Sequence, residues 1–318
     1  MESPNLKIVP KPPLAVILGP TAVGKTRLAI NLAQAGNMEI ISADALQIYR
    51  EMDIGTAKPS AFERSLVPHH MIDIVSPAEH YNAGRYEREA GEAIRKVLQS
   101  GKIPLLVGGC GLYLKAVLHG IFQGPENDPV LREQLRQEAQ MRGEYYLHER
   151  LREIDPETAR KLHHRDQPRL IRAIEVYLKT GIPLSVLQKR HSFPESRYRT
   201  KIIGLFRDRH DLYTRIETRI DQMIAAGLVA EVQGLLDAGY SEHSTALQGL
   251  GYKQIVAALK GQYSCEEAVR LLKRDTRHYA KRQFTWFRQV EDVHWIDLGT
   301  YPEEQAVRKM KKVLADLG

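Results

Sequence analysis

The glycine-rich segment at residues 19–26 constrains the fold and the function of this chain more than any other feature of its sequence. It fits the pattern GxxxxGK[ST] at every fixed position, and its members are Gly19, Pro20, Thr21, Ala22, Val23, Gly24, Lys25 and Thr26. An apolar run at 14–18 precedes it and a helical pattern at 27–33 follows it. In this strand–loop–helix order, backbone N–H groups turn around phosphate oxygens at the start of the helix. The segment predicts a phosphate or diphosphate site, with Lys25 on a terminal phosphate and the Thr26 hydroxyl on Mg²⁺.

Apolar runs and helical patterns alternate along the first part of the chain. Runs at 39–42 and 104–107 resemble buried strands, which predicts an α/β fold with a P-loop NTPase-like parallel sheet and flanking helices. After a turn-rich joint the pattern becomes that of successive polar helices, one of them from an N-cap at Asp166 to Gly181. A strand-like run returns at 202–206. We therefore expect a P-loop catalytic core from residues 1–124 and 201–318, with an inserted all-helical domain at 125–200.

Composition excludes several classes of protein. Among 318 residues, 46 Lys and Arg stand against 39 Asp and Glu, so the net charge of +7 permits a polyanionic partner without requiring one. The two cysteines, Cys110 and Cys265, have no spacing typical of zinc sites or disulfide frameworks. No apolar run approaches the roughly 20 residues of a membrane span. We expect a cytoplasmic monomer without a membrane segment.

The phosphate loop alone leaves open which compound binds. A usual NTPase has an apolar strand that ends in a magnesium-holding Asp, whereas the run at 105–107 ends in Gly-Gly-Cys-Gly. The Asp that follows a strand is Asp44, which could face an acceptor, as in small-molecule kinases, or cap a helix. These residues predict the transfer of a group from a phosphorylated donor to an acceptor near Asp44, without specifying the group. A P-loop kinase for a nucleoside or another small acceptor and a non-catalytic, nucleotide-gated RNA-binding protein are the alternatives.

Beyond the phosphate loop, a series of segments resembles the tRNA dimethylallyltransferase family. These segments, in order over nearly the whole chain, are residues 42–49, 52–59, 68–73, 106–114, 166–176, 211–223, 251–253 and 276–288. The resemblance implies transfer of a dimethylallyl group from dimethylallyl diphosphate to the exocyclic N6 amine of the adenine 3′-adjacent to the anticodon in tRNA. Diphosphate leaves, so the cradle would hold a prenyl diphosphate rather than ATP.

The same resemblance implies roles for individual residues. Asp44 matches the general base, and Thr26 and Arg219 match groups at the diphosphate, while the role of Arg215, one turn earlier, is left open. Contact with the tRNA anticodon stem-loop is implied for Asp44, Ala45, Leu46, Gln47, Cys110, Arg132, Pro168, Arg169, Leu170, Ile171 and Arg172. Cys110 stands where the family usually has threonine, and a thiol is only a weak donor. A nucleophilic cysteine is not expected, because direct displacement needs none.

Charge is concentrated near the C-terminal end of the chain. Residues 270–288 hold seven basic residues and one acid, and Arg270, Lys273, Arg277 and Lys281 recur at three- or four-residue intervals. On a helix this spacing gives a basic face, which predicts that Lys273, Arg277 and Lys281 bind the phosphate backbone of tRNA. A solvated helix face is the alternative.

Overall fold

The computed structural model describes residues 11–122, 124–191 and 196–317. The chain divides into two compact units. One, the sheet unit, comprises the chain up to His119 and from Glu195 onward, and the other, the helical unit, is Gly120–Pro194. Sequence patterns placed the insertion at 125–200, but strand β5 already begins at Arg199, so the helical segment ends earlier. Where the chain leaves and re-enters the sheet unit, Arg197 N donates to the carbonyl of Leu118 at 3.1 Å.

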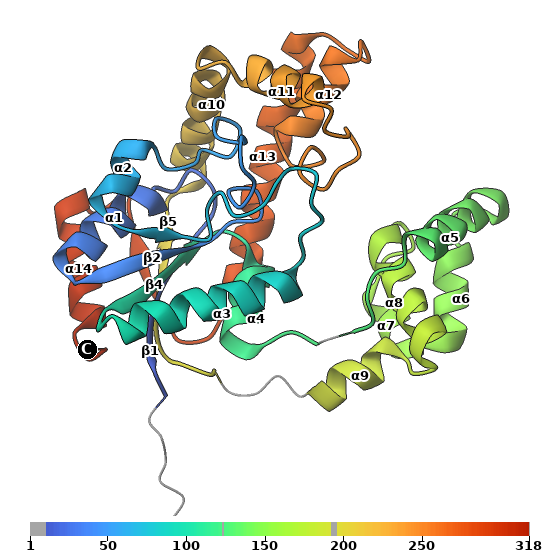
Figure 1. The fold of residues 1–318 in the computed structure, drawn as a ribbon, viewed down its shortest axis with the longest axis horizontal. Helices are drawn as coiled ribbons and strands as arrows, with labels where there is room; N and C mark the ends of the chain where they lie inside the picture. The colour runs from blue at the N-terminus through green and yellow to red at the C-terminus, as the bar shows by residue number, and fades with distance from the viewer. Residues whose placement is uncertain (1–10, 123, 192–195, 318) are drawn as a thin grey trace, which may run out of the picture. The chain divides into compact units, whose positions relative to one another are not determined.

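Six parallel strands form the sheet, in the order β3-β2-β4-β1-β5-β6 (Figure 1). They are β1 (Pro13–Leu18), β2 (Met38–Ala43), β3 (His69–His70), β4 (Ile103–Gly108), β5 (Arg199–Phe206) and β6 (Val293–Asp297). The predicted α/β class is confirmed, and the four expected strands are β1, β2, β4 and β5. The short β3 and the edge strand β6 were not predicted.

The parallel register gathers the carboxyl ends of the strands at one edge, where such sheets bind ligands. Gly108 at the end of β4 pairs with Leu18 of β1 and with Ala43 of β2. A Cβ on Gly108 would lie 2.1 Å from the Ala43 carbonyl oxygen, so only glycine allows the strands to end this close together. The loops after these three strands therefore begin side by side.

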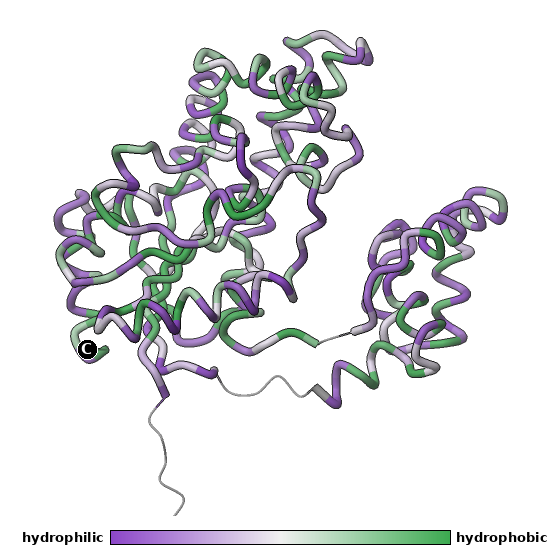
Figure 2. Tube along the Cα trace, viewed as in Figure 1, coloured by the Kyte–Doolittle hydropathy of each residue, from purple (hydrophilic) through white to green (hydrophobic). Residues whose placement is uncertain are grey.

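Helices cover the sheet unit on both faces. They are α1 (Lys25–Ala35), α2 (Ala61–Leu66), α3 (Ala83–Gln99), α4 (Gly111–His119), α10 (Arg209–Ala225), α11 (Leu228–Asp237), α12 (Tyr252–Leu259), α13 (Cys265–Phe287) and α14 (Glu303–Leu314). Strand order runs outward from β1 to β2 and back to β4, so right-handed crossovers place α1 and α3 on opposite faces. In Figure 2 the green, hydrophobic parts of the trace lie along the strands between them.

Helices α10 and α13 pack against each other, and α11 and α12 complete this group (Figure 1). Leu212, Ile216, Ile220 and Ile224 recur at a spacing of four along α10, and the first three are buried while Ile224 is half-buried. None of the described helices is both long and apolar enough to cross a membrane.

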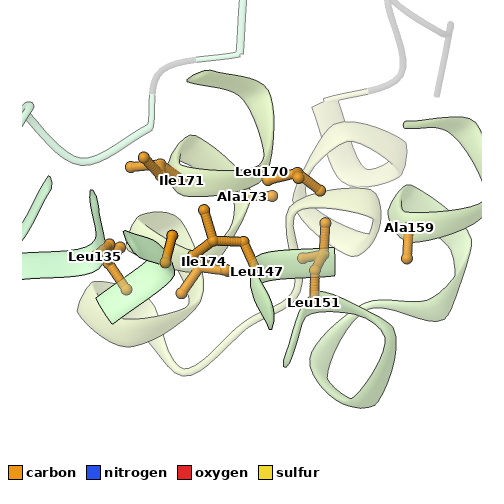
Figure 3. Close-up of a cluster of buried hydrophobic side chains, with 9 residues drawn as sticks. Leu135, Leu147, Leu151, Ala159, Leu170, Ile171, Ala173 and Ile174 are labelled. Carbon is orange, nitrogen blue, oxygen red and sulfur yellow. The ribbon is translucent and has the colours of Figure 1, made fainter. Parts of the chain in front are cut away.

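The helical unit has its own hydrophobic core, drawn in Figure 3. Its helices are α5 (Pro129–Arg142), α6 (Tyr146–Ile154), α7 (Pro156–Lys161), α8 (Gln167–Thr180) and α9 (Leu184–His191). Helix α8 follows Asp166 and ends at Gly181, whose φ of 69° is the left-handed conformation that suits glycine. Leu170, Ile171 and Ile174 of α8 fill the core, at 0–3% exposure. A separate core indicates that this unit is stabilised by its own packing.

Candidate active site

The phosphate loop joins β1 to α1 and ends at Gly24, the N-cap of α1, with a φ of 112°. A Cβ on Gly19 would lie 2.7 Å from the Leu205 carbonyl oxygen, so the loop passes β5 too closely for a side chain. Lys25 Nζ donates to the carbonyl oxygens of Gly19 and Pro20, both at 2.9 Å. The lysine thus lies across the mouth of its own loop, in the position that the motif requires.

Two arginines, Arg207 just before α10 and Arg215 within it, hold the back of the phosphate loop. Arg215 Nε donates to the Ala22 carbonyl at 3.0 Å, and Arg207 Nε donates to the Val23 carbonyl at 3.1 Å. Each bond satisfies a carbonyl at the back of the loop. Arg215, whose role the sequence leaves open, thus binds the backbone of the phosphate loop.

Arg219 lies one turn further along α10 and lines a cavity together with Thr21, Ala22 and Asp44. Burial, then the charge of Arg215, lowers the pKa of Arg219, and Asp44 opposes that shift. Burial, then the charge of Arg219, also lowers the pKa of Lys25, to about 7, again against Asp44. Neighbouring cations of which one lowers the pKa of the next mark a place where an anion is stabilised.

Asp44 follows β2 and shapes the turn that comes next. Its Oδ1 accepts from Leu46 N at 2.9 Å and from Gln47 N at 3.2 Å. Residues 45–50 form turns rather than a helix, so the helix-cap interpretation of Asp44 is wrong. Both bonds go to Oδ1, and Oδ2 is not needed to hold the turn.

Two cavities meet at Asp44. The smaller, of about 50 Å³, is lined by Lys25, Thr26, Asp44 and Gln47 among others. The larger, of about 350 Å³, contains Asp44 and Arg219 in its wall, while its apolar lining includes Ile216, Ile220, Met223, Leu250, Leu272 and Tyr279. Asp44 therefore stands between the phosphate loop and a mostly apolar chamber.

Gln283 of α13 was not singled out by the sequence, although it lies within the segment 276–288. It is buried, its Oε1 accepts from Thr21 N at 2.8 Å, and its Nε2 donates to the Gly109 carbonyl at 2.8 Å. One amide thus connects the phosphate loop to the turn after β4. The one sequence signal for Gln283 is that a polar residue stands on the buried face of an amphipathic helix. Periodicity alone does not distinguish such a residue from its apolar neighbours on that face.

Cys110 lies in the turn between β4 and α4. Its N–H donates to the Ala43 carbonyl at 3.2 Å. Burial raises the pKa of the Cys110 thiol to about 11, although backbone N–H groups of Tyr113 and Leu112 oppose the shift. The thiol is protonated at neutral pH, which agrees with the expectation that it is not a nucleophile.

The predicted basic face of α13 needs a correction. Lys273 forms an ion pair with Asp221 at 2.6 Å, and Arg277 pairs with Glu217, both acids belonging to α10. Two of the three cations predicted to bind tRNA are therefore neutralised within the protein. Lys281 has no ion pair among the described residues and lies in a surface hollow beside His278 and Arg282.

The predicted tRNA contacts in the helical unit divide in the same way. Leu170 and Ile171 have their side chains in the core of the helical unit, and the predicted contact of these two residues with tRNA stays a prediction. Pro168 and Arg169 are exposed at the start of α8. Arg132 and Arg172 both bind Glu175, whose side chain is 0% exposed, over 2.8 and 2.5 Å. Burial raises the pKa of Glu175, but its bonds from these arginines and from Asp128 N outweigh that effect and bring it to about 2.

Comparisons with known proteins agree with this geometry. The sequence model of the IPP transferase family matches residues 47–290, and that of isopentenyl transferases matches residues 12–67. A tRNA dimethylallyltransferase of Halothermothrix orenii is 48% identical over 95% of this chain and 93% of that protein. One of Desulforudis audaxviator is 50% identical over 90% and 92%.

Solved structures give the same result. The tRNA isopentenylpyrophosphate transferase of Bacillus halodurans has a TM-score of 0.73 and 39% identity, covering 96% of both chains. A eukaryotic dimethylallyltransferase acting on tRNA has a TM-score of 0.80 and 28% identity, covering 96% of this chain and 80% of its own. The kinase alternative is not favoured. The chain therefore belongs to the tRNA dimethylallyltransferase family of prenyl-group transferases.

Proposed function

We propose that this protein transfers the dimethylallyl group of dimethylallyl diphosphate to the N6 amine of the adenine 3′-adjacent to the anticodon in tRNA, releasing diphosphate. The position of Asp44 carries the proposal. It borders both the cavity at Lys25 and Thr26 and the larger apolar chamber. A diphosphate on the loop and a prenyl group in the chamber would bring the bond that breaks close to this carboxylate.

The reaction is a displacement at the first carbon of the prenyl group. The adenine nitrogen forms a bond to this carbon, the carbon–oxygen bond to diphosphate breaks, and Asp44 accepts the proton that the amine loses. Lys25, Arg219 and the loop N–H groups stabilise the charge of the departing diphosphate. Apolar side chains such as Ile216 and Ile220 hold the prenyl group and keep water from the reacting carbon.

The oxygen-bearing residues of the smaller cavity fit the expected Mg²⁺. Thr26 and Asp44 line it, as does His69, whose buried Nε2 has no hydrogen-bond partner among the described residues. Mg²⁺ is usually held by one or two protein oxygens, with waters and phosphate completing its shell. No group of three or more His, Cys, Asp or Glu side chains arranged for a metal occurs in the described residues, so a diphosphate-assisted site held by Thr26 suits them better. The ion would supply positive charge to the leaving diphosphate.

The target adenine is stacked in the anticodon loop and must flip out before it can enter the chamber. We propose that Ala45, Leu46 and Gln47 contact the flipped base. Leu46 lines the chamber and Ala45 is exposed at its edge. Lys281, Arg169 and Pro168 supply exposed groups for the anticodon stem-loop. We further propose that the protein acts as a monomer in the cytoplasm, which sedimentation of the free enzyme tests for the oligomeric state.

The test supplies labelled dimethylallyl diphosphate and unmodified tRNA to the wild type and to Asp44→Asn. The asparagine keeps the oxygen that accepts from Leu46 and Gln47 but is a far weaker base, so we expect transfer to disappear while tRNA affinity stays within about twofold. Asp237→Asn, which alters a surface contact to Gln233, is the matched control. Retained turnover in Asp44→Asn would remove Asp44 as the base. Unlabelled tRNA, together with ATP turnover on a small acceptor, would instead support a kinase.

A further inference from the structure

One carboxylate holds the loop that follows the Asp44 turn. Glu231 of α11 accepts from three successive backbone N–H groups, those of Asp53 at 2.9 Å, Ile54 at 2.7 Å and Gly55 at 3.1 Å. It also accepts from the Tyr252 hydroxyl at 2.6 Å. Each carboxylate oxygen accepts two hydrogen bonds, so all four acceptor positions of Glu231 are occupied. Hydrogen bonds to a charged acceptor are the stronger kind.

Tyr252 fixes the same loop by packing. Its side chain is fully buried, and a Cβ on Gly55 would lie 2.6 Å from the tyrosine ring. Gly55 therefore has to be glycine for the loop to reach the ring. Burial, then the Glu231 carboxylate, raises the pKa of Tyr252, so the phenol stays protonated and donates its hydrogen bond.

The loop is also closed on itself. Lys58 is almost fully buried, and its Nζ donates to the Tyr49 carbonyl at 2.9 Å and pairs with Asp53 and Asp73 at 2.5 and 2.6 Å. Thr56 Oγ1 donates to the Met52 carbonyl at 2.7 Å. Side-chain bonds therefore hold residues 52–58 together, and Glu231 attaches them to α11.

The far end of this loop reaches the candidate base through Gln47. Gln47 Nε2 donates to the carbonyl oxygens of Thr56 and Ala57 at 3.3 and 3.4 Å, and Gln47 N donates to Asp44. Ser42 Oγ donates to Gln47 Oε1 at 3.1 Å and sets the orientation of the amide. Gly55, Thr56 and Ala57 also line the chamber that contains Asp44. The loop is therefore both a wall of the chamber and a support of the Asp44 turn.

We propose that Glu231 is a positioning residue of this enzyme, which, together with Tyr252, clamps the loop 53–57 so that Gln47 and the chamber wall keep Asp44 aligned with the bound adenine. It touches neither the phosphate loop nor a reacting atom. The proposal rests on the proposed function and explains the segments at 52–59 and 251–253, to which the site described above gives no role.

The test measures three quantities on full-length Glu231→Gln. We expect kcat for prenyl transfer to fall about tenfold, because the glutamine amide faces N–H donors that the carboxylate accepted from. The Asp53, Ile54 and Gly55 amides should exchange hydrogen about tenfold faster. The dissociation constant for inorganic diphosphate, bound at the phosphate loop, should stay within about twofold.

Glu242→Gln is the matched control. It removes the carboxylate of an ion pair with Lys260, 3.3 Å apart, and leaves the loop 53–57 untouched. All three quantities should keep their wild-type values. If Glu231→Gln does not fold, Tyr252→Phe decides, because it keeps the ring against Gly55 and removes a single donor. We expect a kcat about threefold lower there.

A wild-type kcat in Glu231→Gln, or unchanged exchange at residues 53–55, would overturn the clamp. So would a loss of diphosphate affinity as large as the loss of kcat, because that pattern indicates general damage. If the wild type transfers no prenyl group to tRNA, the proposed function is contradicted instead. Hydrogen exchange at residues 53–55 and the affinity for diphosphate then still decide whether Glu231 clamps the loop.

Discussion

Gln283 Nε2 donates to the Gly109 carbonyl oxygen at 2.8 Å, a bond that joins the last part of the long helix α13 to the turn after the central strand β4. The other atom of the same amide accepts from Thr21 of the phosphate loop. Three segments far apart in the chain thus share one buried side chain. A buried backbone group that loses its hydrogen-bond partner destabilises the folded state, because no water takes the partner's place.

Gln283→Ala should lower the free energy of unfolding by about 2–3 kcal/mol, since it leaves the Thr21 N–H and the Gly109 carbonyl without this partner. It should also weaken the binding of inorganic diphosphate, because the phosphate loop loses a support. Denaturant unfolding and calorimetric titration measure the two effects. Gln289→Ala, at an exposed position just beyond the same helix, is the control and should change neither.

Lys25 should react with an amine-labelling reagent over an unusual pH range. Its pKa of about 7 implies that the neutral, reactive amine forms as pH rises through 7, well below the usual 10.5 of a lysine. Inorganic diphosphate should suppress the labelling, because an anion next to the amine favours its charged form. Mass spectrometry of the labelled peptides, with Lys260 as internal reference, follows both effects. Labelling of Lys25 that begins only near pH 10 would contradict the lowered pKa.

Glu175 should make the stability of the helical unit depend on pH. Its folded pKa of about 2 lies below the usual 4.5, so its stabilising contribution is complete above about pH 4.5 and disappears as pH falls towards 2. Glu175→Gln should remove this dependence and cost about 3 kcal/mol at neutral pH, because Arg132 and Arg172 lose their shared counter-charge. Unfolding measured between pH 2 and 7 tests it. Glu153→Gln, at an exposed position of α6, should behave as the wild type.

Lys281 and Lys273 should differ in their contribution to tRNA binding. Lys281→Gln should reduce the slope of log affinity against log salt concentration by about 1, as expected for the loss of one phosphate contact. Lys273→Gln should leave the slope unchanged, because Asp221 already neutralises that lysine. Filter-binding titrations over a range of salt concentrations compare the two. A wild-type slope in Lys281→Gln would show that α13 does not meet the tRNA backbone at Lys281.

The central strands and the phosphate loop could be predicted because their signals are local. The run at 14–18, the glycines of the loop and the helix behind it lie next to one another in the chain. Strand β6 carries the weaker pattern Val-His-Trp-Ile-Asp at the edge of the sheet, and only Ile296 of its five residues is buried. Strand β3 has only two residues and depends on its pairing with β2.

The parts of the site that escaped prediction depend on contacts between distant segments. Periodicity placed the cations of α13 on one face but could not show that Glu217 and Asp221 of α10 lie opposite them. The role of Glu231 likewise becomes visible only when α11 meets the loop after β2. Leu170 and Ile171 lie in a segment that resembles the family and also follow an apolar helical pattern. The structure shows that both side chains pack in the core.

The bond between Arg197 and Leu118 has a consequence for how this chain tolerates change. The helical unit departs and returns through two neighbouring points, so the sheet closes without it, and the register of β5 on β1 does not depend on the length of what lies between. A change in the length of the helical unit would therefore leave the pairing of β1 with β5 in place.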